Sequence, residues 1–139
     1  MVIRARILAV VAMMAAAASC GGGSNPITGS SPGAPTLLEV QAQVLTPRCA
    51  VSGCHVSATA PFGLDMSSVS DSAANLIGVA SAEKPLLNRV EPGDSANSYL
   101  YWKISGNPDI NGDPMPASGG PLSPADLALL AAWIDGGAN

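Results

Sequence analysis

The segment Cys49-Ala-Val-Ser-Gly-Cys54-His55 constrains this chain most, because it holds the only histidine and both cysteines that lie outside the N-terminal region. Two thiols followed by an imidazole are what covalent attachment of a haem requires. The thiols add to the two vinyl groups of the ring, and the imidazole then lies under the iron as an axial ligand. The commonest spacing leaves two residues between the cysteines, whereas four stand between them here. Cys54 and His55 keep the usual adjacency, so the segment predicts a haem site whose first thioether closes a longer loop.

Two other interpretations of this segment stay open. In an oxidising compartment Cys49 and Cys54 would form a disulfide, which stabilises so small a loop by only about 2 kcal/mol, and His55 would then be an ordinary surface residue. A zinc site is the other alternative. Zinc takes about four ligands, so a carboxylate would have to complete a set of two cysteines and one histidine.

The N-terminus predicts export and lipidation. Arg4 and Arg6 precede an apolar run over residues 7–18, which is too short to span a bilayer and suits the core of a signal peptide. The small residues before Cys20 are similar to a bacterial lipoprotein box, in which the cysteine is lipidated and becomes the new N-terminus. Gly21 after it favours the outer membrane of a Gram-negative host. An ordinary signal peptide or an uncleaved anchor is the alternative.

This interpretation divides the chain into a signal peptide (1–19), a lipid-anchored flexible linker (20–35) and one domain (36–139). The linker is rich in Gly, Ser and Pro and has Ile27 as its only large aliphatic residue, so it cannot bury enough surface to fold. Lipidation of Cys20 leaves one cysteine pair and no odd thiol.

The net negative charge of the mature chain limits the kinds of partner it can attract. Without the signal peptide the chain has ten acidic residues and four basic ones, a formal charge of −6. Nucleic acids and anionic lipid surfaces are therefore excluded as electrostatic partners, and a redox partner with a basic docking face would be steered towards the domain. The four basic residues are Arg48, Lys84, Arg89 and Lys103.

Capping residues and apolar spacing predict three to four helices and no alternating strand. Thr36 caps a helix to about Leu45, with Leu37, Val40 and Val44 on one face, and Pro47 ends it before Cys49. A short helix starts at Ser70 or Asp71, runs through Ile77 and is ended by Gly78. The remaining helices run from Ser95 through Ile104, ended by Gly106, and from the cap Ser123 with Pro124 in its first turn to the pair Gly136-Gly137.

The expected fold is therefore all-α, with long Gly- and Pro-rich loops. The whole chain has 15 Gly and 12 Pro but only one Phe, two Trp and two Tyr. Long irregular segments bury little apolar surface per residue. A haem would supply a large apolar body for such an interior.

Four stretches of the domain carry a resemblance to a known family. They are VLTPRCAVSGCH (44–55), GLDM (63–66), RVEPGDSANSYLYWKI (89–104) and GDPMPASGGPLSPADLALLAAWIDGGA (112–138). In these stretches the domain resembles the small c-type cytochromes, and among them the haem-binding domains of planctomycete and myxobacterial envelope proteins. The resemblance implies a small cytochrome c-like fold around one covalently bound haem c. It also implies electron transfer rather than enzymatic catalysis. The wide cysteine spacing departs from the usual pattern.

Met115 is the sixth iron ligand that this resemblance implies. A thioether is a soft donor suited to haem iron, and Pro114 and Pro116 restrict the backbone on both sides of it. The alternative is a loop methionine that fills a gap. Met66 is the competing methionine, and we expect it to pack against the ring or the core.

Four further residues receive weaker roles. Arg89 is expected either to pair with a haem propionate or to be an exposed loop residue. Tyr99 and Trp102, three residues apart on one helix, are expected to contact the haem or to belong to the core. Trp133 is expected to pack the last helix against the first.

No hydrolase or phosphate-binding motif is present, and a possible calcium loop at 109–113 lacks its later glutamate. The sequence therefore predicts a lipid-anchored electron-transfer protein of the bacterial envelope, with haem c on Cys49 and Cys54 and with iron held by His55 and Met115. The main alternative is a disulfide-stapled lipoprotein that binds a partner without redox chemistry. A haem domain that senses or catalyses, with Met115 displaced by a small ligand, is a third.

Overall fold

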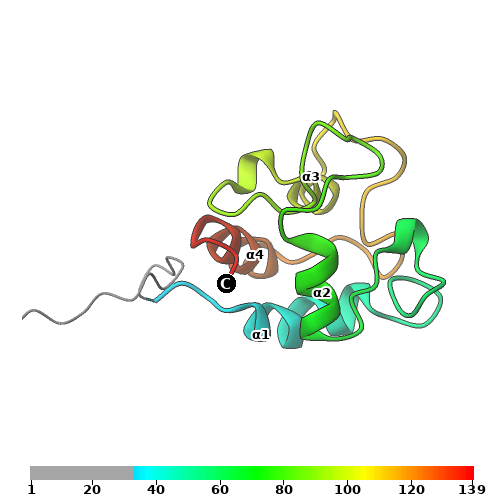
Figure 1. The fold of residues 1–139 in the computed structure, drawn as a ribbon, viewed down its shortest axis with the longest axis horizontal. Helices are drawn as coiled ribbons and strands as arrows, with labels where there is room; N and C mark the ends of the chain where they lie inside the picture. Colours follow the sequence, from blue (N-terminus) through cyan, green and yellow to red (C-terminus); the bar gives the residue numbers. More distant parts are fainter. Residues whose placement is uncertain (1–32) are drawn as a thin grey trace, which may run out of the picture.

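A computed structural model describes residues 33–139, and every regular element among them is a helix (Figure 1). Strand-type pairing among the described residues is limited to two isolated bridges, Ile77 with Val90 and Ala80 with Asn88. The all-α prediction is confirmed for this part of the chain. The elements are α1 (Leu37–Val40), the π-helix η1 (Gln41–Cys49), the 3₁₀ turn η2 (Pro61–Gly63), α2 (Val69–Leu76), the 3₁₀ turn η3 (Ser95–Asn97), α3 (Tyr99–Ser105) and α4 (Pro124–Asp135).

The first helix begins as predicted but does not end as predicted. Thr36 and Glu39 form a reciprocal capping box at the start of α1. The helix then continues as η1 to Cys49, so the expected end before Cys49 at Pro47 was wrong. In a π-helix each amide donates to the carbonyl five residues back, and the Ala50 amide donates to Leu45 O over 2.7 Å, across the proline. Cys49 therefore lies at the end of a helix rather than in a loop.

The two short helices differ from prediction at their starts. Ser68, not Ser70 or Asp71, caps α2, and its Oγ accepts the Asp71 amide at 3.1 Å. The predicted single helix from Ser95 is broken at Ser98, which is extended (φ −94°, ψ 118°) between η3 and α3. Ser98 Oγ accepts the Glu91 amide at 2.8 Å and donates to Asp94 O at 2.8 Å. These contacts with the preceding loop hold Ser98 out of the helix.

Helix α4 follows the predicted pattern and lies between α1 and α3 (Figure 1). Ser123 and Asp126 form its capping box, with Pro124 in the first turn. Trp133 is fully buried, and its Nε1 donates to Asn139 O, which also accepts the Leu37 amide at 2.7 Å. The last helix is thus fixed against the first around Trp133, as the sequence predicted.

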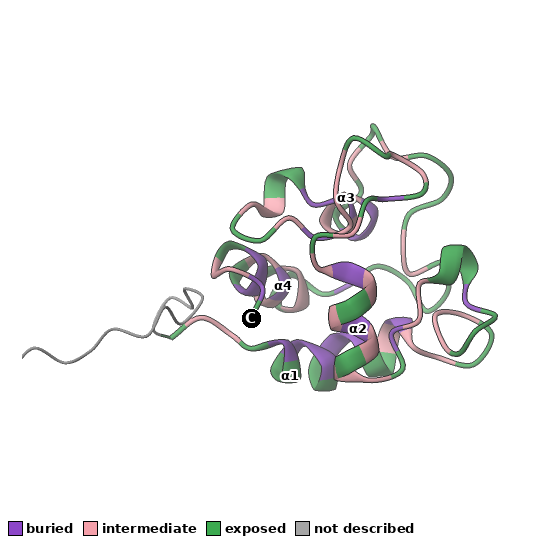
Figure 2. Cartoon of the chain, in the orientation of Figure 1, coloured by how far each residue is buried: buried purple, intermediate pink, exposed green. Residues whose placement is uncertain are grey.

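Buried side chains gather on the inward faces of the helices, whereas the long connections are mostly exposed or half-buried (Figure 2). A buried pair of hydrogen bonds links η1 to the segment before α2 and to α2 itself. Gln41 Nε2 donates to Met66 O at 2.8 Å, and Ser72 Oγ donates to Gln41 Oε1 at 2.6 Å. The core consists of Leu37, Val40, Val44, Leu45, Cys49, Met66, Leu76, Val90, Ile104, Leu122, Leu130, Trp133, Ile134 and Ala138.

The predicted signal peptide, Cys20 and all but the last three residues of the predicted linker lie outside the described residues. Among residues 33–139, no helix combines the length and the hydropathy needed to cross a membrane.

Candidate functional site

The loops and helices enclose a cavity of about 280 Å³ with predominantly apolar walls. Its volume is close to the lower end of the range for ligand pockets, about 300 Å³. The apolar side chains Leu64, Met66, Leu76, Leu100 and Ile104 line it. Besides Met66, six residues that the sequence analysis assigned to haem attachment, iron ligation or haem contact reach this one cavity: Cys49, Cys54, His55, Arg89, Tyr99 and Met115.

His55 is half-buried in the cavity wall, and its ring orientation is fixed by the backbone. Nδ1 lies 3.1 Å from Leu64 O. Because a carbonyl oxygen can only accept, Nδ1 carries the proton and Nε2 keeps a free lone pair. Burial lowers the pKa of His55; the Leu64 bond opposes this shift and the charge of Arg89 adds to it. The imidazole is therefore held neutral and in the tautomer that binds a metal through Nε2.

Both cysteines reach the cavity as free thiols, and neither forms a disulfide. Cys49 is buried at the end of η1, and burial raises the pKa of its thiol to about 11 against the opposing charge of Arg48. Cys54 is half-buried after a turn in which its amide donates to Val51 O at 2.9 Å. The His55 amide donates to Cys49 O at 3.2 Å, so the motif closes on itself.

The two candidate methionines are held in different ways. Met66 is 2 % exposed and belongs to the core as well as to the cavity wall, and its amide donates to His55 O at 2.9 Å. Met115 is half-buried and reaches the cavity from a different segment, with its amide donating to Lys103 O at 2.7 Å on α3. Met66 thus packs in the core as expected, whereas Met115 is half-buried and packs against the core from outside it.

Arg89 fastens one rim of the cavity. Its Nη1 donates to Asn75 O and its Nη2 to Phe62 O, both at 2.8 Å, and burial lowers its pKa. Phe62 lines the cavity, yet its side chain is 66 % exposed and its φ is +56°. A bulky residue in this left-handed region is strained, and the Arg89 contact helps to hold it there.

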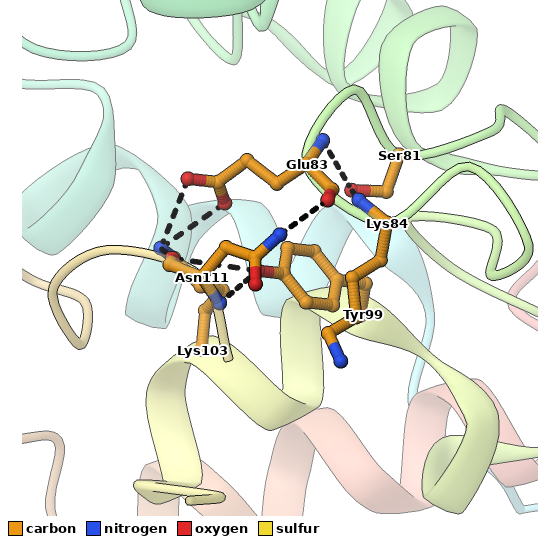
Figure 3. Close-up of polar contacts among 6 residues, drawn as sticks. All are labelled: Ser81, Glu83, Lys84, Tyr99, Lys103 and Asn111. Atoms are coloured by element: carbon orange, nitrogen blue, oxygen red, sulfur yellow. Dashed lines mark hydrogen bonds and ion pairs between the residues drawn. The ribbon is translucent and has the colours of Figure 1, made fainter. Parts of the chain in front are cut away.

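A polar cluster borders the cavity on the side of α3 (Figure 3). Lys103 is buried and forms an ion pair with Glu83 at 3.1 Å, and its Nζ donates to Asn111 O at 2.7 Å. The Asn111 amide donates to the Tyr99 hydroxyl at 2.9 Å, and Asn111 Nδ2 donates to Glu83 O at 2.6 Å. The cluster ties two loops to α3, and its members Glu83, Tyr99 and Lys103 line the cavity.

Trp102 does not line this cavity. Its Nε1 donates to Ala96 O, and the Lys84 ammonium lies 5.4 Å from the centre of the ring. Of the predicted pair on α3, only Tyr99 is at the site.

Sequence reasoning missed four charged or aromatic residues of the cavity wall: Arg48, Phe62, Glu83 and Lys103. For Arg48 a signal was available, because it directly precedes Cys49. For Glu83 and Lys103 no local pattern distinguishes them from solvent-exposed charges. A direct metal site is not indicated, since residues 33–139 contain no group of three His, Cys, Asp or Glu side chains placed to hold an ion.

Comparisons with models of protein families, with curated proteins and with solved structures gave no match to this chain. The function is therefore inferred from the residues that line the cavity and from their geometry.

Proposed function

We propose that this domain is an electron-transfer protein that carries one haem c in the cavity, attached through Cys49 and Cys54. The iron ligands in this proposal are His55 and Met115. One observation carries the proposal: a single apolar cavity is bordered by both free thiols, by an imidazole with Nε2 available, and by a thioether. When bound, the haem would supply a one-electron couple.

The donor set suits a haem better than it suits a single metal ion. Two thiols, an imidazole and a thioether match the four bonds that covalent attachment and axial ligation need. A structural zinc site needs about four donors that converge on one point, and the described residues offer no such group. The haem would occupy the apolar volume between α3 and the loops, where Leu64, Leu100 and Ile104 are available to cover its faces.

The residues of the chain have separate roles in this proposal. Leu64 O fixes the tautomer and direction of His55, and the bond from the Met115 amide to Lys103 O places the thioether segment on α3. Arg89 brings positive charge to the cavity wall, where it would offset a haem carboxylate, whereas the charge of Lys103 is balanced by its ion pair with Glu83. We further propose a cytochrome c-like fold, supported by the packing of α4 against α1.

The same proposal includes attachment of the mature protein to the bacterial envelope through a lipidated Cys20. It also includes docking to a redox partner with a basic face, which the excess of acidic residues supports.

The experiment is production of the full chain in a host that attaches haem to exported proteins, followed by absorption spectroscopy and solvent extraction. We expect a red protein whose visible bands sharpen on reduction and whose colour stays with the polypeptide after acidic organic extraction. The double variant Cys49→Ser/Cys54→Ser is the matched control and should release its colour. A colourless parent protein would overturn the proposal and favour the disulfide-stapled binding module. Binding of carbon monoxide to the reduced parent at neutral pH would instead indicate a displaceable Met115.

A further inference from the structure

Arg48 links the segment that carries the cysteines to the loop that follows Met115. It lies in the last turn of η1, directly before Cys49. Its Nη2 lies 3.2 Å from Gly119 O, 2.8 Å from Gly120 O and 3.4 Å from Pro121 O. One guanidinium nitrogen thus reaches three successive carbonyls more than 70 residues further along the chain.

The loop has a backbone that presents these carbonyls together. Gly119 and Gly120 both have φ of +76°, a left-handed conformation that only glycine adopts at little cost. A side chain at either position would be strained even though there is space for it. The Gly-Gly-Pro sequence therefore forms an acceptor site for one cation.

This contact is the polar attachment of the loop. Met115 at its start is bonded to Lys103 O, and Leu122 at its end is buried in the core. Between these two points, within the described part of the chain, the hydrogen bonds made by residues 116–121 all come from Arg48. Residues 117–121 are exposed, so little apolar packing is available to hold them.

We propose that Arg48 is a positioning residue for Met115. By fixing the loop 116–121 against the end of η1, it sets how firmly the thioether is held towards the haem site next to Cys49. This inference rests on the proposed function. It assigns Arg48 to the loop carbonyls rather than to a haem carboxylate.

The test uses the full chain from a haem-attaching host, with the variants Arg48→Met and Arg48→Lys. Lys84→Met is the matched control, because it removes the same charge from a residue outside the cavity wall. Imidazole is titrated into the oxidised protein, where it competes with Met115 for the iron. Deuterium exchange is followed for residues 115–122. Hydrogen bonds from a charged donor are worth enough for loss of Arg48 to raise imidazole affinity about tenfold.

We expect this increase for Arg48→Met together with faster exchange confined to the loop, a smaller increase for Arg48→Lys, and parent behaviour for Lys84→Met. Equal imidazole affinity in Arg48→Met and Lys84→Met would overturn the inference. So would an Arg48→Met protein whose reduction potential shifts without easier displacement of Met115, since that result indicates a carboxylate contact. A parent protein without haem would overturn the proposed function itself, and colour in the parent distinguishes the two failures.

A second variant covers the case in which Arg48→Met does not fold. Gly120→Ala strains the acceptor side of the same contact without adding a steric clash. We expect it to raise imidazole affinity in the same direction. Unchanged affinity in a folded, haem-loaded Gly120→Ala protein would count against the inference.

Discussion

The two sides of this domain are held together by different interactions. On the helical side, α1, η1, α3 and α4 contact one another through a continuous apolar core with Trp133, Leu130 and Ile134 fully or almost fully buried. On the loop side, residues 50–68, 77–98 and 106–121 are largely exposed or half-buried. Three basic side chains fasten that side by donating to backbone carbonyls: Arg48, Arg89 and Lys103.

This difference indicates where the chain depends on a bound group. Apolar side chains such as Leu64, Leu100 and Ile104 line the cavity between the two sides without filling it. Most of the buried core residues lie on the helices, and Met66 and Val90 of the loops join them, whereas much of the cavity wall comes from the loop side. The proposed haem would complete the apolar interior on the loop side. Loss of the haem should therefore destabilise the loop side more than the helical side.

Replacement of His55 should have the largest effect, because it removes the proposed axial ligand from the loop side. For His55→Ala in the haem-loaded chain we expect loss of the parent low-spin spectrum and a decrease of more than about 3 kcal/mol in the free energy of unfolding. Absorption spectroscopy and thermal unfolding measure the two effects. Gln43→Ala, exposed on η1, is the control. A variant with the spectrum and thermal stability of the parent would contradict the assignment of His55.

A core substitution on the helical side should lower the stability of the protein without affecting the haem site. Leu130 is 1 % exposed on α4, and Leu130→Ala should lower the free energy of unfolding by about 2–5 kcal/mol through the cavity it leaves. We expect a similar decrease with and without haem, and no change in the spectrum of the folded protein. Leu129→Ala, half-buried on the same helix, should cost less. A large spectral change in Leu130→Ala would mean that the two sides are not independent.

Loss of the Lys103 contacts should destabilise the loop side by a smaller amount. Lys103→Met keeps the apolar stem but removes the ion pair with Glu83 and the bond to Asn111 O. We expect a decrease of about 1–3 kcal/mol in the free energy of unfolding and faster deuterium exchange at residues 107–115. Lys84→Met serves as the control. Equal exchange of this loop in both variants would show that the buried ion pair does not hold it.

The smallest expected effect concerns acid stability at Asp94. Hydrogen bonds from the Asn97 side chain and amide lower the pKa of Asp94 in the folded protein. The charged carboxylate therefore contributes stability above its ordinary pKa of about 3.9, and this contribution is lost as the pH falls through the lowered value. Asp94→Asn should flatten the fall in melting temperature between about pH 6 and about pH 3. An unchanged pH profile would contradict this role.

Local signals in the sequence predicted the features that depend on neighbouring residues. The helix caps Thr36 and Ser123 and the end of α3 at Gly106 were predicted from residue type alone. Pro47 and Ser98 were misjudged. Contacts in the folded chain, and not local propensity, determine the π-helical bonding around Pro47 and the hydrogen bonds from Ser98 to the preceding loop.

The candidate site divides in the same way. Cys49, Cys54 and His55 were identified from a short motif and Met115 from the family resemblance, and the structure places all four around one cavity. The hydrogen bonds from Arg48 to the Gly119–Pro121 carbonyls join residues far apart in the chain, and no local sequence pattern predicts that they meet. The left-handed conformation of Phe62 was not foreseen either, because a bulky residue there is unfavourable unless the surrounding structure imposes it.

The central claim is that a haem is covalently bonded to Cys49 and Cys54, and intact mass measurement of the denatured chain tests it most directly. We expect a mass equal to that of the processed polypeptide plus one haem, and loss of this increment in Cys49→Ser/Cys54→Ser. A mass equal to that of the processed polypeptide, or lower by the pair of hydrogens lost when a disulfide forms, would contradict it.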